Sequence, residues 1–101
     1  MASCYEIAQL RNNALHPAQL LWLATMGSAK TLHLEKEIGN LKVGYIADVI
    51  AIDLKSTDVI TQRADLAMDI WEAIFPTIMM GDDRAIAATF MAGNLVHSAN
   101  M

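Results

Sequence analysis

The spacing of apolar residues along the first quarter of the chain predicts two helices. Ile7 and Leu10 share one face of a short helix over residues 5–12, which a pair of asparagines ends because asparagine tolerates the left-handed conformation. Pro17 then starts a second helix, since the first helical turn does not use the N–H that proline lacks. The broad apolar face over residues 18–24 indicates that this second helix packs against the rest of the protein.

Two further helices are predicted from caps and spacing. The Thr-Met-Gly-Ser run at residues 25–28 is expected to interrupt the second helix, with Thr25 capping a short helix over about residues 26–32. Apolar residues at helical spacing predict a longer helix over about residues 63–78. Pro76 falls near the end of that helix and is expected to kink or end it.

Runs of β-branched and apolar residues predict three strands. Residues 48–54 are apolar at nearly every position, which indicates a strand covered on both faces. A connection is expected at residues 58–61. Near the end of the chain, residues 86–91 and 95–97 flank a turn that contains Gly-Asn, and they are expected to pair as a hairpin.

Together these elements predict an α+β fold of about four helices and about three strands, without a closed barrel. We expect one small domain over residues 1–101. Helices are expected over about residues 1–36 and 62–80, and strands over about residues 37–61 and 84–98. A complete (β/α)₈ barrel is excluded by length, because it needs about 250 residues.

The composition is more apolar than that of an average soluble domain. Hydrophobic residues make up 54% of the chain, charged residues make up 18%, and the mean hydropathy is +0.31. A small chain buries a modest share of its surface, so exposed apolar patches and a partner surface are expected. No apolar run approaches the ~20 residues of a membrane helix, and the first residues lack the basic and apolar regions of a secretory signal. We therefore expect no membrane association.

Charge and cysteine content narrow the partners and the compartment. The net charge is −4 and the basic residues are scattered, which argues against nucleic acid as a partner. Cys4 is the single cysteine, so it cannot form an internal disulfide, and it fits a reducing compartment. We expect a cytoplasmic protein.

The chain offers no spaced set of metal ligands. A catalytic zinc needs three protein ligands and an open position for water. His16, His33 and His97 match neither an H-x-H nor an H-E-x-x-H pattern. His16 is expected at a helix start, His33 near a helix C-terminus and His97 on a terminal strand. We therefore expect no catalytic, cofactor-binding or metal-binding residue in this chain.

Asp82, Asp83 and Arg84 form a charged cluster in an otherwise apolar region. Adjacent residues in a turn or strand point in different directions, which disfavours acid–base chemistry by paired carboxylates. A structural turn with a local ion pair is the first interpretation. An interface with another part of a larger enzyme, or with a second subunit, is the alternative.

Residues 38–50, Ile-Gly-Asn-Leu-Lys-Val-Gly-Tyr-Ile-Ala-Asp-Val-Ile, form the most informative segment. Its glycines indicate turns on both sides of Leu41 before the apolar strand begins. The segment resembles the C-terminal I-G-x-L-x-x-G-x-x-A-D signature of amidohydrolases, which leads into a strand of a small β-domain beside a metal-binding barrel. Tyr45 stands where that family often has Lys or Arg.

Three further segments extend the resemblance to nearly the whole chain. Residues 15–32 are similar to the family pattern S-P-x-E-A-x-x-L-A-T-x-G-G-A-x-x-L, with His16 in place of Ser and Ser28 in place of the second Gly. Residues 93–96 are similar to the closing G-x-x-V hairpin. Residues 81–86, which follow the long helix, resemble guanine deaminases more than the superfamily at large.

The resemblance implies the C-terminal portion of a guanine-deaminase-like amidohydrolase. Such enzymes bind zinc through an H-x-H pair, two later histidines and an Asp, and they use a Glu as proton shuttle. All of these groups precede the segment that resembles this chain. The implied parent reaction is the zinc-dependent hydrolytic deamination of guanine to xanthine and ammonia, and the chain by itself is expected to be inactive.

Resemblance and composition leave two hypotheses for the role of the chain. As part of such an enzyme, it would pack against the missing barrel portion. Alternatively, it is a standalone non-catalytic binding or oligomerisation module derived from such an enzyme. In that case self-association would cover the exposed apolar surface.

Overall fold

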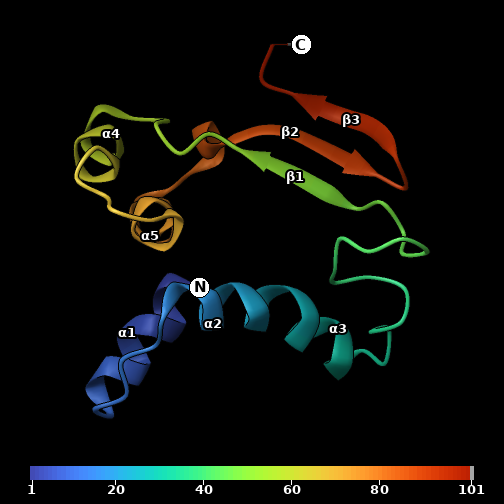
Figure 1. Ribbon diagram of the computed structural model, residues 1–101, viewed down its shortest axis with the longest axis horizontal. Coiled ribbons are helices and arrows are strands. Elements are labelled where there is room, and N and C mark those ends of the chain that lie inside the picture. Colours follow the sequence, from blue (N-terminus) through green and yellow to red (C-terminus); the bar gives the residue numbers. More distant parts are fainter. Residues whose placement is uncertain (101) are drawn as a thin grey trace.

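The computed structural model describes residues 1–100 and shows an α+β fold (Figure 1). Its strands form one three-stranded antiparallel sheet that does not close into a barrel, so the predicted fold class is confirmed. None of the helices in this range is long and apolar enough to cross a membrane. In chain order the elements are α1 (Ala2–Leu10), α2 (Pro17–Trp22), the π-helix η1 (Leu23–Gly27), α3 (Ser28–Thr31), β1 (Val49–Ile52), α4 (Asp58–Ala64), α5 (Ile70–Met80), the 3-10 helix η2 (Asp83–Ala85), β2 (Ile86–Met91) and β3 (Asn94–Ser98).

The helix that begins with α2 continues through η1 into α3 without the predicted interruption at residues 25–28. The hydroxyls of Thr25 and Ser28 donate hydrogen bonds to the carbonyl oxygens of Leu21 and Leu23, each at 2.7 Å. Ser28 reaches back five residues, which suits the wider turn of a π-helix. The predicted break and the predicted capping role of Thr25 are therefore wrong, because these hydroxyls bond within the helix.

The single helix predicted over residues 63–78 is two helices, α4 and α5. Thr57 caps α4, its hydroxyl accepting the N–H of Ile60 at 3.3 Å. Asp69 caps α5, its carboxylate accepting the N–H of Glu72 at 2.8 Å. The connection predicted at residues 58–61 is wrong, because these residues belong to α4. Each helix starts where a polar side chain satisfies its first free N–H groups.

Helix α5 packs against α1 and α2. Tyr5 of α1 lies edge-on to Phe75 of α5, with ring centroids 5.0 Å apart. Pro76 is buried inside α5, which continues to Met80, so the proline does not end the helix. Packing against neighbouring helices offsets the N–H that the proline lacks.

The sheet has β2 at its centre, paired with β1 on one side and β3 on the other (Figure 1). Ile50 lies opposite Thr89, and Thr89 lies opposite His97. The strand predicted within residues 48–54 and the C-terminal hairpin are confirmed. Ile50 is 52% exposed, so the prediction that both faces of this strand are covered is wrong for this chain.

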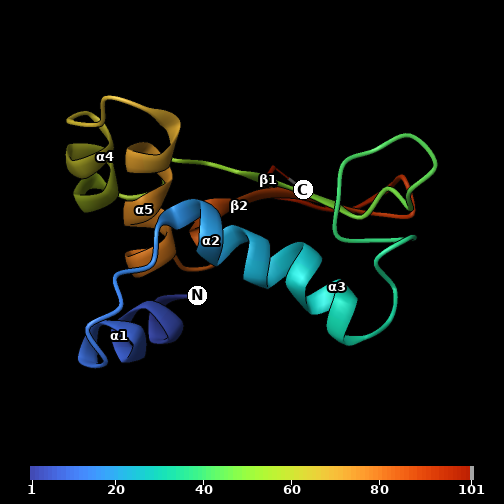
Figure 2. The ribbon, with the colours of Figure 1, turned by 60° about the horizontal axis from the view of Figure 1, so that its bottom comes forward.

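Few apolar side chains of the described residues are buried. The radius of gyration is 14.8 Å, larger than the ~13 Å of a compact domain of this length. Figures 1 and 2 place α2 and α3 in a layer apart from the sheet, joined to it by the loop before β1. Large apolar side chains such as Leu10 (84%) and Met68 (91%) are exposed, as the composition predicted. Besides Pro76, the buried apolar residues are Leu20, Ala29, Ile60 and Ala85.

The loop between α3 and β1 depends on two glycines with positive φ. Gly39 has φ of +91° and Gly44 has φ of +95°, a region that favours glycine. A Cβ on Gly39 would lie 2.9 Å from the Cβ of Ala29 and 3.1 Å from the Cα of Met26. A Cβ on Gly44 would meet nothing within 4 Å. Gly39 therefore allows both the turn and the close approach of the loop to the helix.

Substituting the two glycines separates these effects. Gly39→Ala is expected to lower the free energy of unfolding by about 2–4 kcal/mol, because it adds a steric contact to the backbone strain. Gly44→Ala is expected to cost about 1–2 kcal/mol, since it adds strain alone. Urea unfolding followed by circular dichroism measures both variants. Equal losses would show that the contact between Gly39 and the helix does not contribute.

Candidate functional site

The segment that carries the amidohydrolase signature, residues 38–50, is tied to the end of the helical layer. The hydroxyl of Tyr45 donates to the carbonyl oxygen of Glu35 at 2.6 Å. The backbone N–H of Ile46 donates to the carbonyl oxygen of Glu37 at 2.8 Å. These bonds fold the loop back on itself just before β1 begins. Tyr45, which stands where the family pattern often has Lys or Arg, thus has a hydrogen-bond partner within the chain.

The Ala-Asp pair of the signature holds the turn between β2 and β3. A carboxylate oxygen of Asp48 accepts the N–H of Ala92 at 2.9 Å, and the carbonyl oxygen of Ala47 accepts the N–H of Gly93 at 2.9 Å. Ala92 and Gly93 both have positive φ, +49° and +82°, so the turn needs support. The signature aspartate is therefore a structural acceptor. Sequence analysis missed this role, because its partner lies 44 residues away.

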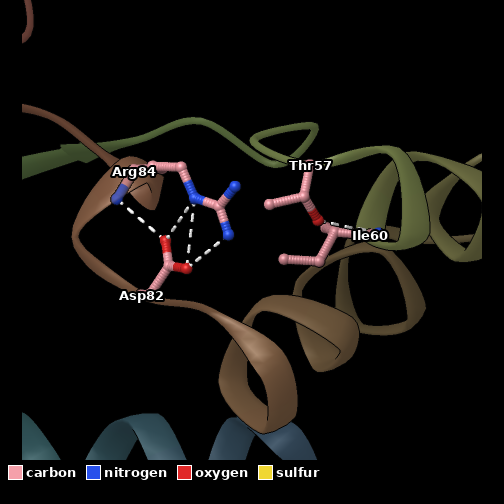
Figure 3. Close-up of polar contacts among 4 residues, drawn as sticks. All are labelled: Thr57, Ile60, Asp82 and Arg84. Carbon is pink, nitrogen blue, oxygen red and sulfur yellow. Dashed lines mark hydrogen bonds and ion pairs between the residues drawn. The ribbon is translucent and has the colours of Figure 1, made fainter.

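Asp82 and Arg84 meet in one turn (Figure 3). Asp83 is the first residue of η2. A carboxylate oxygen of Asp82 lies 2.6 Å from Nη2 of Arg84, and the other accepts the N–H of Arg84 at 3.0 Å. The Arg84 side chain, helped by its backbone N–H, holds the pKa of the Asp82 carboxyl below its ordinary value. Asp82 raises the pKa of the Arg84 guanidinium. Both side chains are exposed, so the pair adds little stability.

The histidines lie where they were predicted and do not converge on a metal. His16 caps α2, His33 follows α3 with φ of +59°, and His97 lies in β3 opposite Thr89. Across residues 1–100 no group of three or more His, Cys, Asp or Glu side chains is placed to hold a metal ion. Cys4 is exposed on α1. The described donor set therefore does not fit the zinc centre that the resemblance implies for a parent enzyme.

An open groove with a volume of about 620 Å³ lies between α1, α2 and α5. Aromatic rings from three helices approach each other around it. Besides the Tyr5 and Phe75 pair, the rings of His16 and Trp71 meet edge-on with centroids 5.8 Å apart. We call this feature the apolar groove. It is lined by Tyr5, Ala14, Leu15, His16, Pro17, Arg63, Asp69, Trp71, Glu72, Phe75 and Pro76.

Comparison with known protein families supports the family signature in residues 38–50. Residues 1–96 match the sequence pattern of the Amidohydrolase family, so this chain belongs to that family. Within it, guanine deaminases resemble the chain. Escherichia coli guanine deaminase is 33% identical over 96 residues, which are 95% of this chain and 22% of that enzyme. Homo sapiens guanine deaminase is 33% identical over 93 residues, covering 89% of this chain and 20% of the human enzyme.

Solved structures show the same relationship. The structure of E. coli guanine deaminase matches with a TM-score of 0.92 and 32% identity, covering 98% of this chain and 23% of that chain. Guanine deaminase from Bradyrhizobium japonicum matches with a TM-score of 0.78 and 25% identity, covering 90% of this chain and 21% of that chain. The predicted resemblance to guanine-deaminase-like amidohydrolases is confirmed. The chain spans about a fifth of the length of these relatives.

The bond between Asp48 and the hairpin turn can be tested with matched variants. Asp48→Ala is expected to lower the free energy of unfolding by about 1–2 kcal/mol, because the N–H of Ala92 loses its acceptor. Asp48→Asn should lose less, since its amide oxygen still accepts. Urea unfolding gives the free energies, and amide exchange at Ala92 reports the bond directly. Equal losses for the two variants would contradict the hydrogen-bond explanation.

Proposed function

We propose that this chain is the C-terminal scaffold portion of a guanine-deaminase-like zinc amidohydrolase. One observation carries the proposal: 98% of the chain matches E. coli guanine deaminase with a TM-score of 0.92, while covering only 23% of that enzyme. A segment that keeps the conformation of a longer relative is suited to the same packing role. The reaction of the complete parent is then the hydrolytic deamination of guanine to xanthine and ammonia.

The segment contributes packing to this reaction and not chemistry. Its described histidines are separate, and Nδ1 of His16 is engaged at the start of α2. Zinc, which supplies the activated water in such enzymes, would be bound by residues of the barrel portion. No proton transfer or binding step is assigned to a side chain of this segment. By itself, the chain is inactive.

The partner in this proposal is the barrel portion of the same kind of enzyme. The exposed apolar side chains and the apolar groove supply surface that a larger body would cover. The Asp82 and Arg84 turn lies near α4 and would contribute a polar contact at such an interface (Figure 3). The parent enzyme would act in purine metabolism in the cytoplasm. Nucleic acid and membranes are not partners in this proposal.

A second hypothesis is a standalone binding or oligomerisation module derived from such an enzyme. The observation that favours it is the extent of exposed apolar surface on a chain with so few buried residues. Self-association would remove that surface from water. This module would be as inactive as the scaffold portion, so the two hypotheses differ in their partner.

Activity measurements test the scaffold hypothesis. The purified chain with zinc and guanine is expected to release no ammonia above the blank. E. coli guanine deaminase that lacks its matching segment should also be inactive, and co-expression with this chain is expected to restore ammonia release. The segment of the E. coli enzyme itself serves as the positive control. The scaffold hypothesis is wrong if that control restores activity and this chain does not, or if this chain is active alone.

Light scattering tests the module hypothesis. A scaffold portion without its barrel is expected to form polydisperse aggregates, because nothing covers its apolar surface. A module is expected to form one soluble oligomer of defined mass. Multi-angle light scattering of the full chain over a concentration series distinguishes the two, and a single sharp mass would favour the module.

A further inference from the structure

His16 forms an unusual start to the helix that runs from α2 to α3. Its backbone is extended, and Nδ1 of its ring accepts the N–H of Ala18 at 3.1 Å. In return, Oε1 of Gln19 accepts the N–H of His16 at 2.7 Å. This reciprocal pair is a capping box in which an imidazole replaces the usual hydroxyl or carboxylate.

The N–H of Ala18 depends on the imidazole alone. Pro17 has no N–H, and the N–H groups of Gln19 and Leu20 both donate to the carbonyl oxygen of His16, at 2.9 and 3.2 Å. No second acceptor for Ala18 is present among the bonds of the described residues. An acceptor at Nδ1 requires a neutral ring with its proton on Nε2, because both nitrogens of an imidazolium are donors.

We infer that His16 is an acid-sensitive cap, which anchors the first turn of α2 when its ring is neutral and releases it when the ring is protonated. Protonation converts Nδ1 from an acceptor to a donor, so that two N–H groups, those of Nδ1 and Ala18, then face each other. The new positive charge also lies at the positive end of the helix dipole. The stabilising effect is therefore present when the ring is neutral and is lost when acid protonates it.

The cap is coupled to α5 through the apolar groove. The His16 ring meets Trp71 of α5 edge-on, so the side chain that caps α2 also contacts α5. The charged groups that share the groove are Arg63 of α4, the α5 cap Asp69, and Glu72 of α5, together with the phenol of Tyr5.

Neither groove carboxylate forms an ion pair with His16 in this structure. Asp69 accepts the N–H of Glu72 at 2.8 Å, and Glu72 accepts the N–H of Met68 at 2.7 Å. The ion pairs among residues 1–100 are Lys55 with Asp65 and Arg84 with Asp82. No ion pair among residues 1–100 therefore replaces the bond that protonation removes, and this inference does not depend on the proposed enzyme role.

Amide hydrogen exchange of the full chain tests the inference. Between about pH 8 and about pH 5, protection of the Ala18 amide, corrected for intrinsic rates, is expected to fall about fivefold, as loss of a cap predicts. His16→Ser is expected to keep its protection at both values, because serine caps without changing charge. His16→Ala should be poorly protected at both. His97→Ser, on β3, should retain the pH dependence of the unmodified chain.

Two results would overturn the inference. One is equal protection of Ala18 at both pH values in the unmodified chain, or the same fall in His16→Ser. The other is a nitrogen-15 spectrum that places the His16 proton on Nδ1 at about pH 8, since that tautomer cannot accept the N–H of Ala18.

Discussion

Residues 38–50 connect the helical layer to the sheet, and the arrangement of the two layers depends on the contacts of this segment. Because few apolar residues among residues 1–100 are buried, the two layers are not held together by a common core. Gly39 lets the loop approach α3 closely, and the Ala47 and Asp48 pair bonds the turn of the β2–β3 hairpin. The first contact requires glycine, because any other residue would add a Cβ. The second requires a side-chain acceptor within hydrogen-bond distance of the N–H of Ala92.

This constraint gives the residues of the family signature structural roles. The signature connects two layers of the structure. Its glycines set the direction of the chain, and its aspartate bonds the turn of a distant hairpin to the start of β1. In a longer amidohydrolase, such a connection would hold the two layers as one rigid surface against the rest of the enzyme. In this chain large apolar side chains and the apolar groove are exposed. Both functional hypotheses therefore include a partner that covers them.

The elements that sequence analysis found are those specified by neighbouring residues. Pro17 after a capping residue starts α2, and the turn at Ala92 and Gly93 makes the hairpin. The Asp82 and Arg84 turn is equally local, since its bonds join residues two apart. The errors arose where competing local signals were present. Thr25 resembles a cap, yet its hydroxyl donates to the carbonyl oxygen of Leu21 within the helix. The caps Thr57 and Asp69 start two helices, α4 and α5, where the apolar spacing predicted one.

The sequence by itself determined the fold class, the family, and the absence of a recognisable zinc ligand pattern, because these depend on periodicity, motif order and residue type. Tertiary structure alone decided which distant groups meet. The bond from Asp48 to Ala92 spans 44 residues, and the contact of His16 with Trp71 needs α5 folded back over α2. Exposure of the sheet was also a tertiary outcome. An apolar strand indicates that its faces can be buried, whereas burial requires a second layer, and none covers Ile50 in this chain.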